Sequence, residues 1–143
     1  MQVFIVGTPL ETAMALSKRH LNNQINEARI ILAALNGAKA WSNHPCVLQY
    51  AEHQEWLENY IDCLTFYKQG EIERAALSST WCEIVTPHFH NEKFLNNMKS
   101  RLYTKDPLHY SEYAEYGVSD TNMYFVDDEW RYYKNGKRVK ENI

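Results

Sequence analysis

The spacing of hydrophobic residues predicts a mainly helical chain. Apolar positions recur with a helical period over residues 10–36, interrupted near Ser17. Thr8-Pro9 suits the start of this segment, because proline is favoured in the first turn of a helix, and Asn36-Gly37 suits its end. Similar periods predict helices over residues 45–70, 71–78, 91–103 and, as a turn or short helix, 106–116. Residues 81–87 are expected to be irregular.

The two ends of the chain follow a different pattern. Residues 1–7, MQVFIVG, are a short apolar segment that we expect to be extended. Residues 123–126 and 130–134 are rich in aromatic residues and are separated by three acidic ones, which predicts a β-hairpin within residues 118–137. The sequence contains no repeat, low-complexity tract or linker. We therefore predict one compact, mainly α domain over residues 1–143, with the hairpin as a C-terminal appendage.

The helix expected around residues 18–35 has an unusually polar edge. At 3.6 residues per turn, one face is apolar and forms the expected core stripe, made of Leu21, Ile25, Ala28, Leu32 and Leu35. The adjacent edge carries His20, Asn23, Gln24 and Glu27. This edge is either an ordinary solvated flank, where Glu27 pairs with Lys18 or Arg19, or the floor of a polar site. In such a site Glu27 could orient water, take a proton or stabilise a cation.

Composition narrows the class of protein. With 143 residues, 45% of them hydrophobic and 23% charged, the chain can form one folded domain with a single core. The net charge of −3 lacks the basic excess that is usual in nucleic-acid-binding proteins. Three cysteines without paired spacing predict reduced thiols and a cytoplasmic protein. The N-terminus has no signal-peptide pattern, and no apolar run is long enough to span a membrane.

Two loops contain residues that can bind phosphate or metal. Asn43 and His44 stand just before an expected helix, where backbone N–H groups attract anions such as phosphate. Alternatively, Asn43 caps the helix and His44 packs against Trp41. The His-Phe-His of residues 88–90 and Cys82 are zinc-ligand types, but a closed zinc site needs four ligands. We therefore predict no metal and no cofactor, and expect these histidines to pack in the loop or to contact a phosphate.

Basic residues and tyrosines are interleaved in the C-terminal third. The basic residues Lys93, Lys99, Arg101 and Lys105 lie near Tyr103, Tyr110, Tyr113 and Tyr116. Cations mixed with aromatic rings can hold a nucleic-acid backbone and stack on bases, although a solvated helix face gives the same pattern.

The N-terminal amine is a further candidate group. A free α-amine has a reference pKa of about 7.7–8.0, so part of it is neutral at physiological pH. It can therefore act as a nucleophile and form a Schiff base more readily than an ordinary lysine. Every chain has such an amine, and this feature is informative only together with others.

Four motifs in a fixed order resemble the pyrimidine-dimer DNA glycosylase (endonuclease V-like) family. They are MQVFIVG at the N-terminus, RHLNNQINEA at residues 19–28, WSNHP at 41–45 and KDPLHY at 105–110. Each motif alone is unspecific, whereas the four in this order are fairly specific and span most of residues 1–110. Residues 120–137 match less clearly. The chain is most similar to a bacterial and phage branch of the family that begins with Met-Gln.

The resemblance implies a compact helical fold with a buried N-terminus and a two-step repair reaction on DNA. The α-amine attacks C1′ of the damaged nucleotide and displaces its base, and the resulting imine permits a β-elimination that cuts the strand. The family's catalytic Glu stands seven residues beyond a His-Leu pair, as Glu27 does here. The other implied catalytic residues are Met1 and Gln2, at the end of the chain that carries the nucleophilic amine. The phosphate or base contacts implied by the resemblance are Arg19, His20, Asn23, Gln24, His44, His90, Lys93 and Arg101. Asn43 and Tyr110, from the loop and the tyrosine-rich pattern described above, complete the predicted substrate-binding set.

Two departures from the family keep a second hypothesis open. The bulk of Gln2 disfavours removal of the initiator Met, so the nucleophile would be the Met1 amine. The acidic net charge predicts a low affinity for undamaged duplex DNA, since neutralisation of phosphates supplies most of the non-specific affinity. The first hypothesis is a DNA glycosylase and AP lyase acting on a damaged or modified base. The alternatives are a non-catalytic module for a nucleotide-like ligand, and an interaction protein that uses its Tyr-rich hairpin.

Overall fold

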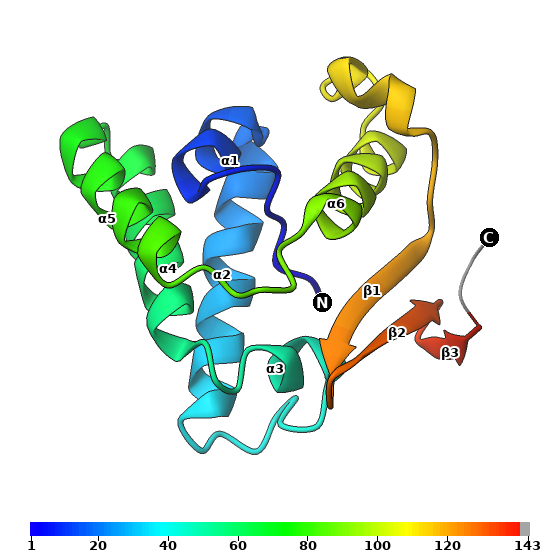
Figure 1. The fold of residues 1–143 in the computed structure, drawn as a ribbon. Helices are drawn as coiled ribbons and strands as arrows, with labels where there is room; N and C mark the ends of the chain where they lie inside the picture. The colour runs from blue at the N-terminus through cyan, green and yellow to red at the C-terminus, as the bar shows by residue number, and fades with distance from the viewer. Residues whose placement is uncertain (141–143) are drawn as a thin grey trace. The chain divides into compact units, whose positions relative to one another are not determined.

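Figure 1 shows the computed structural model, which describes residues 1–140. Among these residues there are seven helices, followed by a three-stranded antiparallel sheet near the C-terminus. The prediction of a mainly α fold ending in β structure is therefore confirmed. The chain divides into two compact units, residues 1–88 and a second unit that begins at Phe89, and each is described below by itself.

The first unit contains five helices. They are α1 (Pro9–Ala15), α2 (Lys18–Leu35), α3 (Pro45–Gln49), α4 (Gln54–Lys68) and α5 (Ile72–Ile84). Thr8 begins α1 with a capping box, in which its hydroxyl accepts the Glu11 N–H and the Glu11 carboxylate accepts the Thr8 N–H. Ser17 caps α2 through its hydroxyl, which accepts the His20 N–H, and this cap explains the interruption expected near Ser17. Helices α2, α4 and α5 pack side by side (Figure 1).

Two predicted boundaries in the first unit are wrong. The helix expected over residues 45–70 is two helices, because the chain turns after α3 and Tyr50 stacks on Trp56 with ring centroids 5.5 Å apart. Helix α5 continues to Ile84, although residues 81–87 were expected to be irregular. Its buried face is made of small residues, Ala75, Ser78, Ser79 and Cys82, and such a face has little hydrophobic contrast with the exposed one.

An aromatic stack forms the centre of the first unit. Trp56 lies between Tyr50 and Tyr60, with centroid distances of 5.5 Å and 5.0 Å, and all three side chains are buried. The N-terminal segment is buried as well, from Gln2 to Ile5, and it belongs to no helix or strand. The first residues of the chain are thus core residues, and their polar backbone groups require partners.

The second unit consists of α6 (Glu92–Lys105), a 3₁₀ helix η1 (Ser111–Tyr116) and the strands β1 (Thr121–Val126), β2 (Glu129–Lys134) and β3 (Lys137–Val139). The predicted hairpin is β1 and β2, and β3 is an unexpected third strand. Asn135 and Gly136 join β2 to β3 with positive φ angles of 52° and 76°. Asn-Gly is the preferred sequence for a two-residue turn of this kind, so the sequence did contain a signal for β3.

Candidate functional site around the N-terminus and Glu27

Gln24 is the centre of a buried hydrogen-bond network that fixes the N-terminal segment. Its Nε2 donates to the backbone carbonyl of Gln2 at 2.9 Å, and its Oε1 accepts the Phe4 N–H at 2.8 Å. A neighbouring β-strand offers the same donor and acceptor to residues i and i+2, so one amide side chain replaces a strand partner. Gln24 is 2% exposed, which leaves these backbone groups little access to water.

Tyr60 completes this network from α4. Its hydroxyl lies 2.7 Å from the Phe4 carbonyl and 3.0 Å from Gln24 Oε1, and its single proton is donated to one of these two acceptors. Burial, followed by nearby Cys63 and the Glu27 carboxylate, holds the pKa of Tyr60 well above its usual value. Tyr60 therefore remains a neutral donor.

Glu27 connects the network to the protein surface. Its side chain is half-buried, one helical turn beyond Gln24, and Oε2 accepts the second N–H of Gln24 at 3.0 Å. One amide nitrogen thus bridges the carboxylate of Glu27 and the carbonyl of Gln2. The predicted catalytic carboxylate and the start of the chain are joined by the side chain between them.

Cys46 lies within the electrostatic reach of both the terminal ammonium and Glu27. Burial is the main reason why the pKa of its thiol rises to about 12; the ammonium lowers this pKa, and Glu27 raises it. The Cys46 thiol is accordingly protonated and is no nucleophile. Its Sγ is buried and lies 3.9 Å from Gln2 Oε1.

His44 lies beside the N-terminus and begins α3. Its Nδ1 accepts the Cys46 N–H at 3.0 Å, so this nitrogen carries no proton. Burial, and then the charge of the terminal ammonium, lowers the pKa of His44. A neutral His44 with its proton on Nε2 is therefore favoured. The Trp41 ring packs edge-on at a centroid distance of 5.9 Å.

Comparison with known families gives a match, and it covers the part of the chain that contains this network. Residues 1–65 match the family model described as pyrimidine dimer DNA glycosylase. No curated protein and no solved structure gave a significant match. The resemblance inferred from the sequence is confirmed over residues 1–65, a stretch that includes Gln24, Glu27, His44 and Tyr60.

Several predicted site residues gather within the matched stretch. Met1, Gln2, Gln24, Glu27 and His44 are linked by the contacts and charges described above. On α2, Arg19 and Asn23 are exposed and His20 is half-buried. Asn43 is exposed and does not cap α3, because His44 occupies the capping position. The alternative that Asn43 caps this helix is therefore wrong.

The remaining predicted residues belong to the second unit and are described there alone. His90 stacks on Phe94 at 5.3 Å, and Lys93 Nζ donates to the Tyr132 hydroxyl at 3.0 Å. Arg101 binds Asn122 Oδ1 and the Ser119 carbonyl, both at 3.0 Å, which ties α6 to β1.

Tyr110 is the one predicted contact residue without exposed surface. Its side chain is 0% exposed. A fully buried ring offers no face to a base, which favours a structural role for Tyr110. Arg101 is half-buried, and its contact with substrate stays a prediction.

The zinc-type residues do not assemble. Among residues 1–140, no group of three or more His, Cys, Asp or Glu side chains is arranged to hold a metal ion. The three cysteines are free and buried, and Cys82 Sγ faces the Trp56 carbonyl at 3.5 Å. Among the same residues no helix is long and apolar enough to cross a membrane.

Cys46, Tyr50 and Tyr60 were missed by the sequence analysis. The burial of Tyr60 could be inferred from spacing, since Trp56, Tyr60 and Leu64 recur at i and i+4 on α4. The hydrogen bond from Tyr60 to Phe4 could not, because it joins residues 56 positions apart.

Proposed function

We propose that the protein is a DNA glycosylase with an associated AP-lyase activity on a damaged or modified base. The observation that carries this proposal is the bridge made by Gln24 Nε2 between the Gln2 carbonyl and the Glu27 carboxylate. It holds the N-terminal segment beside an acid in the stretch that matches a DNA glycosylase family. A buried amide that secures the first residues is more than a solvated helix flank requires.

In the proposed reaction the neutral Met1 amine attacks C1′ of the target nucleotide. The N–C1′ bond forms as the glycosidic bond breaks, the base leaves with its electron pair and a proton, and opening of the sugar ring gives a Schiff base. Loss of a C2′ proton then expels the 3′ phosphate, and water releases the unsaturated aldehyde and regenerates the amine. Glu27 is the acid–base group for these proton transfers and stabilises the cationic intermediate.

The remaining groups have binding roles in this proposal. Arg19 and Asn23 are exposed on the face of α2 that leads to Glu27, where they can contact phosphates. His20 and His44 are half-buried, and His44 can donate its Nε2 proton to a phosphate or sugar oxygen without carrying charge. Asn43 is exposed beside His44 and extends this polar rim.

Borohydride trapping tests the covalent step directly. A panel of abasic, pyrimidine-dimer and modified-base duplexes is incubated with the protein and borohydride, and the adduct is located by mass spectrometry. The expected adduct is on the Met1 amine. Glu27→Gln keeps the acceptor for Gln24 and removes the charge, so it should reduce base release or strand cleavage by at least about 10²-fold. Glu73→Gln, an exposed acid on α5, is the matched control.

The acidic character of the first unit favours one alternative. Residues 1–88 contain nine Asp and Glu against six Lys and Arg, a poor balance for holding a duplex. A non-catalytic module for a nucleotide-like ligand would bind a mononucleotide tightly and ignore duplex DNA at low salt. The absence of any adduct across the panel, together with such binding, would replace the glycosylase proposal by this one.

A further inference from the structure

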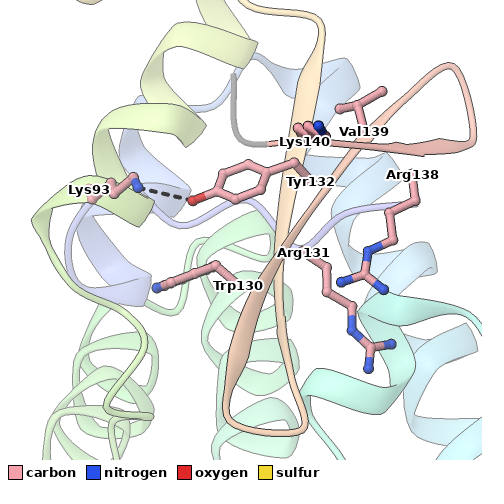
Figure 2. Close-up of a pocket in the computed structure, with 7 residues that line it drawn as sticks. All are labelled: Lys93, Trp130, Arg131, Tyr132, Arg138, Val139 and Lys140. Atoms are coloured by element: carbon pink, nitrogen blue, oxygen red, sulfur yellow. Dashed lines mark hydrogen bonds between the residues drawn. The ribbon is translucent and has the colours of Figure 1, made fainter. Parts of the chain in front are cut away.

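The second unit contains an open cavity of about 680 Å³ on its sheet. Four cationic side chains line it, Lys93, Arg131, Arg138 and Lys140, together with the rings of Trp130 and Tyr132 (Figure 2). Among the described residues, no acidic side chain is part of the lining. The cavity lies outside the stretch that matches the glycosylase family.

The cavity is explained by unequal strand lengths. Strand β2 pairs with β1 along its whole length, from Glu129 to Lys134, but β3 pairs only with residues 132–134. In the part of the chain that the structure describes, the outer edge of β2 before Tyr132 has no neighbouring strand. Side chains from both faces of β2 therefore border the same opening; Figure 2 shows Trp130 and Tyr132 on one side of the ribbon and Arg131 on the other.

One carboxylate joins the two guanidinium groups of the cavity. Glu129 Oε1 accepts from Arg131 Nε and from Arg138 Nη2, each at 3.1 Å. These hydrogen bonds lower the pKa of Glu129, which stays charged. A guanidinium has five N–H donors, so both groups retain donors for a further anion.

The positive charge here exceeds the local negative charge. Of the ten residues 131–140, five are Lys or Arg and none is acidic. Asp127 and Glu129 pair with Arg131, and Glu129 also pairs with Arg138, so two carboxylates face the four cations of the cavity. Lysine and arginine on an edge strand can prevent pairing with another chain. When such cations surround an opening, they can also bind an anion such as phosphate.

The two aromatic side chains of the cavity, Trp130 and Tyr132, indicate that the ligand also contains a flat ring. Trp130 is half-buried and is fixed by Phe94 and Phe125 at centroid distances of 5.7 Å and 5.2 Å. Lys93 Nζ fixes the Tyr132 ring through its hydroxyl at 3.0 Å. A rigid ring beside cations is the arrangement by which proteins stack an unpaired base while binding its phosphate.

We propose that this cavity binds a single nucleic-acid strand, taking one phosphate at Arg131, Arg138 and Lys140 and an unpaired base at Trp130. The inference rests on the proposed function and extends it. It assigns to the second unit an affinity for DNA phosphates that the acidic charge of the first unit does not favour. A strand is preferred to a free nucleotide because the cavity is open, so the nucleotides on either side of the bound one can extend beyond it.

The test uses undamaged, fluorescein-labelled single-stranded DNA of about 12 nucleotides and the full-length protein, with binding followed by anisotropy. Arg138→Gln combined with Lys140→Gln should weaken binding at least about 10-fold. The slope of log K against log salt should fall by about 0.7 for each phosphate contact removed. Lys137→Gln is the matched control, since Lys137 is an exposed cation on the same strand outside the cavity lining. Circular dichroism verifies that each variant is folded.

Three results would overturn the inference: equal losses in the double variant and the control, displacement of the strand by thymidine monophosphate at the strand's own concentration, or tighter duplex binding that is insensitive to the cavity variants. No chemistry occurs in this experiment. A protein that fails the borohydride test but shows cavity-dependent strand binding would refute the glycosylase proposal and leave this inference intact.

Discussion

The two units of the chain place their polar groups in opposite ways. In residues 1–88 the decisive polar contacts are internal, since Gln24, Tyr60 and the backbone of residues 2–4 satisfy one another away from water. In the second unit the charged groups lie on a sheet and face an open cavity. The net charge of −3 arises entirely from residues 1–88, because acidic and basic residues are equal in number from residue 89 onward. Under the two proposals made above, the reactive group and the affinity for a polyanion are separated along the sequence.

Moving the terminal amine is the strongest test of the role assigned to the first unit. One glycine added before Met1 displaces the amine by up to about 3.6 Å while leaving every side chain of the network in place. We expect base release or strand cleavage to fall at least about 10²-fold, because the amine no longer stands at the geometry fixed by Gln24. Rates on a confirmed substrate would be compared with those of a protein that has one glycine added after Ile143. Undiminished activity would show that the amine is not the nucleophile.

Removing the Gln24 amide should have the largest effect on stability. Gln24→Leu leaves the Phe4 N–H and the Gln2 carbonyl without partners inside the protein. Each unsatisfied buried group costs about 1–3 kcal/mol, so the free energy of unfolding should fall by at least about 2 kcal/mol in urea titrations. Asn23→Ala, at an exposed neighbour on the same helix, should change it by less than about 0.5 kcal/mol. Equal stability of the two variants would show that water replaces the amide.

The stability of the first unit should also depend on pH through His44. Burial and the terminal ammonium lower the pKa of His44, so on acidification the unfolded chain takes up a proton there before the folded protein does. The free energy of unfolding should then decrease as the pH falls below about 6.5. His53, whose pKa is lowered by burial and by His88, acts in the same direction.

His44→Asn isolates this contribution, because Asn also caps helices but does not titrate. The decrease in unfolding free energy between pH 7.5 and pH 5 should be smaller in this variant than in the parent protein. His109→Asn, at an exposed position of the second unit, serves as the control. Parallel pH profiles for all three proteins would mean that His44 is not the source.

The smallest expected effect is local to the sheet. Gly136 has a φ of 76° and no atoms within 4 Å of an added Cβ, so Gly136→Ala changes only the backbone preference of the turn. A cost of about 1–2 kcal/mol is expected, seen as faster hydrogen exchange of amides in β2 and β3 with unchanged exchange in α2. Faster exchange in α2 as well would show that the two units do not open independently.

The sequence predicted the helices and their caps better than the site. Local signals such as Thr8-Pro9 and Ser17 act within one turn, so they identified the start of α1 and the break before α2. Gln24 was assigned to a polar edge of α2, yet it is almost fully buried, because its partners come from residues 2, 4 and 60. No spacing within a helix reports such long-range partners.

The sheet shows the complementary limitation. β3 could have been predicted from Asn135-Gly136, a local turn signal that was not used. The cavity could not, because it results from the register at which β3 stops opposite Tyr132. The cations at residues 131–140 were visible in the sequence, but their convergence with Lys93 of α6 was not.

The amide of Gln24 has a consequence for the order of events during synthesis. The N-terminal segment leaves the ribosome first, but its partner Tyr60 is made 56 residues after Phe4. At about 5–20 residues per second, the start of the chain waits roughly 3–11 s before it can dock. During that interval the terminus is accessible to the enzymes that trim or acylate nascent chains. The segment that docks afterwards is buried from Gln2 to Ile5, so modification of the terminal amine would be easier before docking than after it.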